Sequence, residues 1–467
     1  MKCFHFTNGE RRSPDSDDGA GRPATAARVS WARSLSIASS TSTTSTTTEF
    51  RRSEFGGGDS AGLFFLMAQQ RGDANDLRAF TFAELKSATR GFNRGLLIGE
   101  GGFGSVYRGV VNVRVSDIES DGSKMMDVAI KQLNRYGMSS NYLLLIIVLL
   151  LLACVIYGHK EWVNEVNWLG VIKHPNLVRL VGYCAEDDER GIQRLLVYEL
   201  MKNKSLEDHL LGRVPSPLPW MARLRIAQDA ARGLAYLHEE MDFQLIFRDF
   251  KTSNVLLDED FNAKLSDFGL ARLGPAEGYS HVSTSVVGTV GYAAPEYVMT
   301  GKLTIKSDVW SFGVVVYELI TGRRAVEKNL PRNEQLLLDW VKPFVSDSKK
   351  FHSIVDPRLE GQYCKKSAQR LASLANKCLA KQPKNRPKMS EVVEILGSII
   401  EEASAQEEAT DEGKDESKEV EGETEPMKPG NNYLRKVLEI KEKVNLRNKS
   451  IGKLEWKHWT PGLVRTS

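Results

Sequence analysis

The stretch Leu245-Ile-Phe-Arg-Asp-Phe-Lys-Thr-Ser-Asn254 decides the fold, because its polar residues have the types and spacings that phosphoryl transfer uses. Asp249 can accept the hydrogen of an attacking hydroxyl, and Lys251 can lie against a γ-phosphate. Asn254 and Asp267, the latter in an Asp-Phe-Gly motif, offer oxygen ligands for two Mg²⁺ ions. Such a site also requires a glycine-rich loop and a strand lysine upstream, and an Ala-Pro-Glu motif downstream. All three are present in the chain.

The glycine-rich loop is Ile98-Gly-Glu-Gly-Gly-Phe-Gly-Ser-Val-Tyr107, which contains the pattern GxGxxG. Dinucleotide-binding folds use the same pattern between a strand and a helix. Here residues 106–113 continue with a strand pattern, which favours a hairpin lid over ATP whose backbone amides approach the phosphates. The residues expected to contact the nucleotide here are Ile98, Gly99, Gly101, Gly104 and Val106.

The strand lysine is Lys131, in Asp127-Val-Ala-Ile-Lys-Gln132, and it is placed to bridge the α- and β-phosphates. Residues 162, 166 and 169 are apolar at helical spacing. Glu165 borders that apolar stripe, so it can meet Lys131. Glu161, one turn earlier, is the alternative partner.

Two further strand patterns, at 177–183 and 194–198, lead to residues 199–201. We expect this segment to be a hinge whose backbone, from Glu199 to Met201, binds adenine. Residues 220–238 then form a long helical pattern that leads into the catalytic stretch.

Downstream motifs complete the set. Ala294-Pro-Glu296 closes the segment that follows Asp267, and Asp308 begins an apolar helix where it can hold the backbone of the catalytic stretch. Arg386 is expected to pair with Glu296. A surface Glu or Arg is normally solvated, and an exposed pair contributes little to stability. The pairing of these two residues is therefore predicted from their positions in the motifs alone.

This ordered set, from Gly99 to Arg386, resembles the eukaryotic protein kinase family, and most closely the plant receptor-like cytoplasmic kinases of the immune-signalling subfamily. The stretch Phe80-Thr-Phe-Ala-Glu-Leu85, the glycine-rich loop, the catalytic stretch and Gly288-Thr-Val-Gly-Tyr-Ala-Ala-Pro-Glu296 carry the resemblance. It implies an α+β, two-lobed protein kinase fold, with a five-stranded, β-rich N-lobe carrying one main helix and a helical C-lobe. It also implies the cofactors ATP and Mg²⁺, protein substrates and a cell-surface receptor kinase complex as partner.

Lys251 and the Gly288-Thr289 pair resemble Ser/Thr kinases rather than Tyr kinases. Arg248 beside Asp249 indicates control by phosphorylation, because a phosphate on the activation segment could pair with this guanidinium. The candidate phosphate acceptors are Ser283, Thr284, Ser285 and Thr289. Phe247 occupies the place of the family's usual His, and the resemblance implies that it packs in a spine. The other expected spine residues are Leu169, Leu180 and Phe268, the last beside Gly269.

Composition divides the chain into three regions. Residues 1–76, rich in Ser and Thr, are expected to be disordered, and residues 401–467 to form a disordered tail that is acidic and then basic. The kinase domain is expected at 77–400, with an N-lobe at 77–200 and a C-lobe at 201–400.

The net charge of +3 carries no global signature of nucleic-acid binding, so no nucleic-acid partner is expected. The five cysteines are scattered, which favours a reducing compartment, and the N-terminus lacks the apolar core of a signal peptide. Cys3 is either a candidate for S-acylation or an ordinary thiol, and one acyl chain gives only marginal membrane binding. We expect a cytoplasmic protein, peripheral at the plasma membrane, whose oligomeric state the sequence leaves open.

An uncharged apolar run at 142–157, within an anomalous insert at about 138–157, departs from the family pattern between Lys131 and Glu165. A membrane span is unsuitable, because sixteen helical residues cover roughly 24 Å of a roughly 30 Å hydrocarbon core. It would also separate the phosphate loop from Asp249. An exposed functional loop would lose on the order of tens of kcal/mol. We favour a third interpretation, an intron retained in frame.

The sequence therefore predicts a Ser/Thr protein kinase that transfers the γ-phosphate of ATP to protein hydroxyls in receptor-linked immune signalling. The alternative is a catalytically impaired ATP-binding scaffold, because the insert would misplace the helix that carries Glu165.

Overall fold

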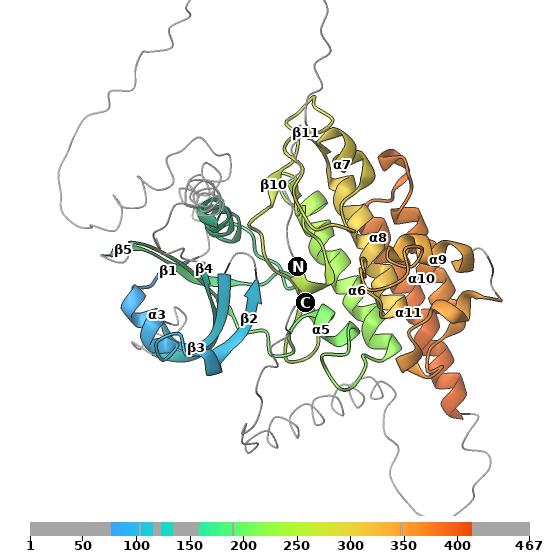
Figure 1. The fold of residues 1–467 in the computed structure, drawn as a ribbon, viewed down its shortest axis with the longest axis horizontal. Coiled ribbons are helices and arrows are strands. Elements are labelled where there is room, and N and C mark those ends of the chain that lie inside the picture. Colours follow the sequence, from blue (N-terminus) through green and yellow to red (C-terminus); the bar gives the residue numbers. More distant parts are fainter. Residues whose placement is uncertain are drawn as a thin grey trace, which may run out of the picture.

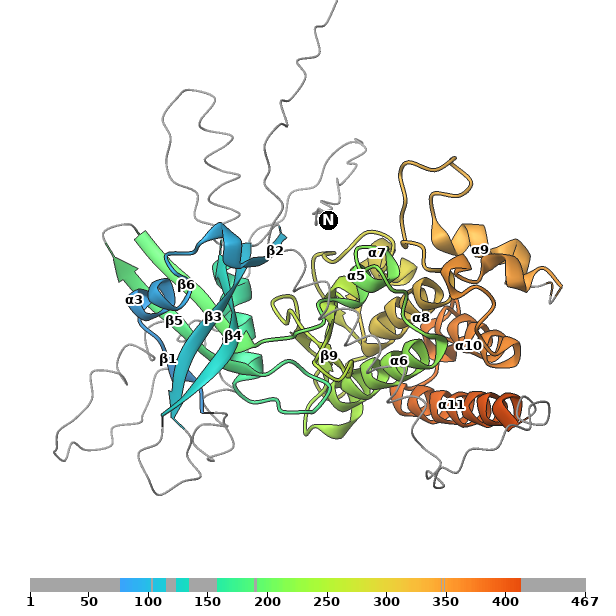
Figure 2. The ribbon, with the colours of Figure 1, turned by 90° about the horizontal axis from the view of Figure 1, so that it is seen from below.

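The computed structural model describes residues 76–101, 104–114, 123–133, 158–188, 191–345, 347 and 349–412. Within these residues the chain forms a sheet-rich N-lobe and a helical C-lobe, which lie side by side (Figures 1 and 2). The predicted α+β two-lobed kinase fold is confirmed. Cys3 and residues 142–157 lie outside the described residues.

The N-lobe is built on a six-stranded sheet in the order β1-β5-β6-β4-β3-β2. Its strands are β1 (Arg78–Ala79), β2 (Leu97–Gly101), β3 (Gly104–Arg114), β4 (Ser123–Leu133), β5 (Leu180–Asp188) and β6 (Gly191–Glu199). All neighbours are antiparallel except β1 and β5, which are parallel.

The expected five strands are one too few, because β1 adds to the edge of β5. A Cβ built on Gly182 of β5 would lie 2.0 Å from the carbonyl oxygen of Arg78, so a larger residue there would exclude β1. This close approach between distant segments carries no local sequence pattern.

Helix α3 (Phe82–Ala88) follows β1 and packs on β3. Thr81 caps its N-terminus in a capping box with Glu84, which satisfies backbone donors that would otherwise have no partner. Leu85 is fully buried in a small apolar cluster with Val128 and Val197 of the sheet. The expected short helix at the entrance of the domain is therefore present.

The helix at 158–169 is the main helix of the N-lobe. Trp162 and Val166 are fully buried, as the apolar stripe predicts. The indole Nε1 of Trp162 donates to the carbonyl oxygen of Leu195 in β6 at 3.0 Å, which ties this helix to the sheet.

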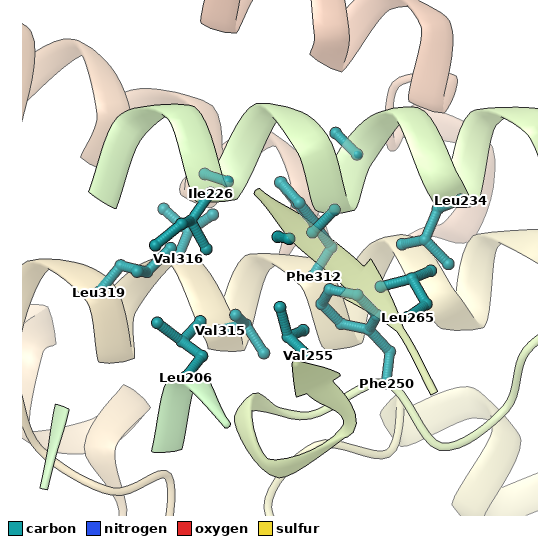
Figure 3. Close-up of a cluster of buried hydrophobic side chains, with 14 of the residues drawn as sticks. Leu206, Ile226, Leu234, Phe250, Val255, Leu265, Phe312, Val315, Val316 and Leu319 are labelled. Carbon is teal, nitrogen blue, oxygen red and sulfur yellow. The ribbon is translucent and has the colours of Figure 1, made fainter. Parts of the chain in front are cut away.

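The C-lobe consists mainly of helices, which surround one large apolar core. These are α5 (Leu206–Leu210), α6 (Trp220–Ala235, continued by a π-helix, Tyr236–Glu240), α7 (Pro295–Thr300), α8 (Ile305–Thr321), α9 (Leu337–Val345), α10 (Lys365–Cys378) and α11 (Met389–Glu412). Figure 3 shows Ile226 and Leu234 of α6 facing Phe312 and Val316 of α8 across this core. Helix α8 is buried along most of its length, so it forms the centre of the lobe.

Three two-stranded antiparallel sheets hold the catalytic stretch and the segment after it. β7 (Leu245–Ile246) pairs with β10 (Arg272–Leu273), β8 (Val255–Leu257) with β9 (Ala263–Leu265), and β11 (Val282–Ser283) with β12 (Lys302–Leu303). A 3₁₀ turn, η3 (Thr252–Asn254), lies between β7 and β8. The catalytic stretch, between β7 and β8, is thus attached at both ends.

The predicted end of the folded domain near residue 400 is too early, because α11 continues to Glu412. Ala403 is buried, so the helix keeps its contact with the core beyond residue 400. Glu402 forms ion pairs with Lys366 and, at 2.7 Å, with Arg370 of α10. One of the first acidic residues of the expected tail therefore has basic partners on a neighbouring helix.

Across the described part of the chain, every helix is too short or too polar to cross a bilayer.

Candidate active site

The catalytic stretch begins with a backbone held by a buried carboxylate. Asp308 of α8 accepts hydrogen bonds from the amides of Phe247, at 2.8 Å, and Arg248, at 2.7 Å. It also lies 2.8 Å from Nε2 of His238. Arg248 has φ of 73°, a strained conformation that needs such support. The predicted contact of Asp308 is present, whereas His238 was missed, because its sequence position shows only a helical pattern.

Asp249 is held by three side chains of the same site. Its Oδ2 accepts from Nζ of Lys251 at 2.5 Å, and its Oδ1 accepts from the hydroxyl of Thr289 at 2.6 Å. Its carbonyl oxygen accepts from Nδ2 of Asn254 at 2.9 Å. Lys251 also donates to Thr289 at 2.9 Å. The carboxylate therefore has a defined orientation with two oxygens near cationic and hydroxyl donors.

This geometry corrects one candidate phosphate acceptor. Thr289 is 5% exposed and its hydroxyl is bonded to both Asp249 and Lys251. A hydroxyl in that position is part of the site and is unsuited to accept a phosphate from another molecule.

Lys131 joins the two lobes. Its Nζ lies 2.7 Å from Oε1 of Glu165 and 3.1 Å from Oδ1 of Asp267. Burial alone would lower the pKa of Lys131, but Asp267 and Glu165 raise it above its usual value. Burial raises the pKa of Asp267, but Lys131 and Lys251 outweigh it and hold that pKa below its usual value. Lysine and aspartate thus stabilise each other as ions.

Glu165, and not the alternative Glu161, is the partner of Lys131. The hydroxyl of Tyr198, at the end of β6, donates to the second oxygen of Glu165. Glu161 is also buried, at 9% exposed, and burial together with Asp267 raises its pKa to about 8. Helical spacing left both residues possible, and the rotation of the helix decides between them.

The hinge segment is anchored at its first residue. The carboxylate of Glu199 lies 2.9 Å from Nζ of Lys264 and accepts from the amide of Arg179, also at 2.9 Å. Met201 follows the end of β6 and packs against the main core. These contacts place the hinge between the lobes, where the resemblance expects adenine.

The glycine-rich loop forms the predicted hairpin between β2 and β3, although its tip at 102–103 lies outside the described residues. Gly104 has φ of 156°, and a Cβ there would lie 2.1 Å from the carbonyl oxygen of Gln132. A Cβ on Gly101 would meet no atom of the described residues within 4 Å. Val106 is opposite Lys131 in the β3–β4 register, and Ile98 is 53% exposed.

The residues present fit ATP and Mg²⁺. Asn254 and Asp267 offer an amide oxygen and a carboxylate, which Mg²⁺ prefers when it also binds phosphates. Lys131 and Lys251 add positive charge for the phosphates. No group of three or more His, Cys, Asp or Glu among the described residues could hold a metal alone.

The guanidinium of Arg248 contacts the side-chain hydroxyl of one of the four candidate phosphate acceptors, Thr284. Its Nη2 donates to Oγ1 of Thr284 at 3.1 Å and to the carbonyl oxygen of Ser285 at 2.5 Å. Its Nε donates to the hydroxyl of Tyr297 at 3.0 Å. Ser283 is exposed in β11. Tyr297 was missed, although its place directly after Ala-Pro-Glu marks it.

The expected aromatic spine is packed. The rings of Phe247 and Phe268 are both fully buried, with centroids 5.1 Å apart at 84°. Leu169 and Leu180 lie in the same core cluster. Gly269 follows Phe268 against the 158–169 helix. A phenyl ring therefore fills the position where the family usually has an imidazole.

Arg386 and Glu296 form the predicted pair, at 2.8 and 2.7 Å through two nitrogens. The side chain of Arg386 is fully buried and also donates to the carbonyl oxygen of Lys306 at 2.7 Å. This is a bidentate pair between a buried arginine and a glutamate whose side chain is 23% exposed, unlike the fully exposed pairs that contribute little.

Comparison with known proteins agrees with this geometry. Residues 93–396 match the family described as protein tyrosine and serine/threonine kinase. The chain is 54% identical over 407 residues to the serine/threonine-protein kinase PCRK1 of Arabidopsis thaliana, covering 86% of this chain and 89% of that protein. It is 61% identical over 330 residues to PCRK2 of the same plant, covering 71% and 73%. The chain therefore belongs to the protein kinase family, as a serine/threonine kinase of the receptor-like cytoplasmic group.

Proposed function

We propose that this kinase transfers the γ-phosphate of ATP to Ser and Thr hydroxyls of protein substrates beside a cell-surface receptor kinase, in plant immune signalling. The observation that carries the proposal is the position of Lys131. Its Nζ lies between Glu165 of the N-lobe and Asp267 of the C-lobe. This contact supports the proposal, because it joins β4 to the Asp-Phe-Gly motif.

Each residue has a separate task in this proposal. Asp249 accepts the hydrogen of the substrate hydroxyl, and Lys251 and Thr289 hold its carboxylate in position. Lys131 binds phosphate oxygens, and Asn254 and Asp267 would hold Mg²⁺. When bound, Mg²⁺ neutralises charge on the phosphates. The glycine-rich hairpin covers the phosphates and excludes water.

The impaired scaffold has no support in the described site. Lys131 and Glu165 lie on either side of residues 142–157 in the sequence, and they are nevertheless 2.7 Å apart. Deletion of 142–157 should therefore leave autophosphorylation intact. Sequencing of the spliced transcript tests the intron interpretation, which a mature message encoding these residues would contradict.

Autophosphorylation with labelled ATP and Mg²⁺ tests the activity. We expect a signal from the wild-type chain and loss of that signal in Asp249→Asn, which keeps the shape of the side chain but cannot act as a base. Equal signals from both proteins would remove Asp249 from its assigned role.

Peripheral binding at the plasma membrane is a further part of the proposal, supported by Cys3 as an acylation candidate. Carbonate extraction should release the protein from membranes, and Cys3→Ser should reduce the bound fraction. Resistance to carbonate would indicate an integral protein instead.

A further inference from the structure

Asn164 makes a direct contact between the 158–169 helix and the Asp-Phe-Gly motif. Its side chain is almost fully buried, and its Nδ2 donates to the carbonyl oxygen of Gly269 at 2.8 Å. The two residues are 105 positions apart and belong to different lobes. The bond reaches the backbone two residues after Asp267.

Glu161 strengthens the same contact by packing. A Cβ built on Gly269 would lie 2.9 Å from Cβ and 3.1 Å from Cγ of Glu161, so the helix lies directly on this glycine. Glu161 and Asn164 are three residues apart and therefore share one helix face. A displacement of the helix would be transmitted to the Gly269 peptide by both residues.

The orientation of the Asn164 amide follows from its single described polar contact. Its Oδ1 is buried and has no hydrogen-bond partner among the described residues. The flipped amide would place that oxygen against the carbonyl oxygen of Gly269. A buried acceptor without a partner lowers the stability of the fold. The favourable polar interaction of the Asn164 side chain is therefore the hydrogen bond that its Nδ2 donates to Gly269.

We propose that Asn164 is a positioning residue, which couples the position of the 158–169 helix to the orientation of Asp267. It acts by holding the Gly269 peptide, and Asp267 itself has φ of 71°, a conformation that its surroundings must maintain. Glu165 reaches the site through Lys131, whereas Asn164 acts on the backbone of the metal-binding motif. The inference rests on the proposed function, because it assigns Asp267 to Mg²⁺.

The test compares Asn164→Ala with Asn176→Ala in the full chain. Asn176 is a matched control, because it is also buried and its Nδ2 donates to a buried carbonyl oxygen, that of Ala263, at 3.0 Å. In the protein without nucleotide, we expect the rate of amide exchange at 269–271 to rise about tenfold in Asn164→Ala and to stay unchanged in Asn176→Ala. A tenfold change is the size expected for the loss of one hydrogen bond. The Mg²⁺ concentration for half-maximal autophosphorylation should rise about tenfold, with the KM for ATP nearly unchanged.

Asn164→Asp is the second variant, because it keeps the shape and replaces the donor by an acceptor. We expect it to show at least the effects of the alanine variant. Should Asn164→Ala melt far below Asn176→Ala, Asn164→Ser is measured in its place, since its hydroxyl is too short to span the contact.

Two results would overturn the inference. One is amide exchange at 269–271 that stays at the wild-type rate in the Asn164 variants. The other is a rise of equal size in Asn176→Ala. The exchange measurement needs no activity. Failure of the proposed function is therefore distinct: it would appear as equal autophosphorylation in the wild type and Asp249→Asn.

Discussion

Nζ of Lys131 in β4 lies 2.7 Å from Oε1 of Glu165 in the neighbouring helix, and the hydroxyl of Tyr198 donates to Oε2 of the same glutamate. Glu165 is thus bound on both sides, which holds the helix against the sheet. The side chain of Glu165 is 1% exposed and that of Lys131 is 14% exposed. Removal of the Lys131 charge would leave Glu165 buried without a cationic partner, and removal of the Glu165 charge would leave Lys131 with Asp267 as its one described ion-pair partner.

Substitution of Glu165 by Gln should therefore reduce autophosphorylation kcat at least tenfold, about 1.4 kcal/mol of transition-state stabilisation. Glu161→Gln is the matched comparison, because it lies on the same helix but makes no described bond to Lys131. Steady-state kinetics with varied ATP measure both. A larger loss in Glu161→Gln would reverse the assignment of the partner.

Phosphorylation of Thr284 should activate the kinase, because this hydroxyl already lies 3.1 Å from the guanidinium of Arg248. One or two charge-assisted hydrogen bonds to a phosphate would order the segment, and we expect an effect of about tenfold on kcat. Thr284→Ala should therefore resemble the phosphatase-treated wild type. Arg248→Gln should abolish the difference between treated and untreated protein.

Ser280→Ala is the control for this experiment, since Ser280 is exposed and bonds to His281 in the same segment. A phosphorylation map should show Thr284 modified and Thr289 unmodified. Phosphate found mainly on Thr289 would contradict the buried position described above.

Glu318 of α8 should make stability depend on pH. Burial raises its pKa to about 8, although Tyr292 donates to it at 2.8 Å and the amide of Ala325 at 2.9 Å. Because the folded pKa lies above the unfolded value, this group stabilises the fold at low pH. Its contribution falls as pH rises from about 4.5 to about 8, by a few kcal/mol.

Chemical unfolding at pH 5, 6.5 and 8 measures this dependence. Glu318→Gln, which cannot ionise, should be less sensitive to pH than the wild type over this range. Glu277→Gln, at an exposed position, should follow the wild type. Parallel curves for Glu318→Gln and the wild type would disprove the assignment.

Arg386→Ala should destabilise the C-lobe by about 2–4 kcal/mol, because it removes a buried side chain that donates to Glu296 through two nitrogens and to the carbonyl oxygens of Ala380 and Lys306. Arg108→Ala is the matched control, since Arg108 pairs with Asp127 at the surface and should contribute about 1 kcal/mol or less. Thermal unfolding compares the two. Similar losses in both variants would show that burial of the Arg386 side chain has no effect.

Much of the candidate site could be predicted because its residues lie in short motifs with specific spacing. Asp249, Lys251 and Asn254 are within six residues of one another, and a loop of that length has few ways to arrange them. The order of strands, loops and helices around them also follows from local patterns. Periodicity placed Trp162 and Val166 in the core for the same reason.

The sequence by itself thus determined the kinase fold and the candidate residues of its site, since these depend on local spacing. Only the tertiary structure decided that Lys131 pairs with Glu165, that Thr289 lies inside the site, and that Asn164 contacts Gly269. It also added β1 to the sheet and extended α11 to Glu412. Each of these depends on packing between segments that are distant in the chain, which no local pattern encodes.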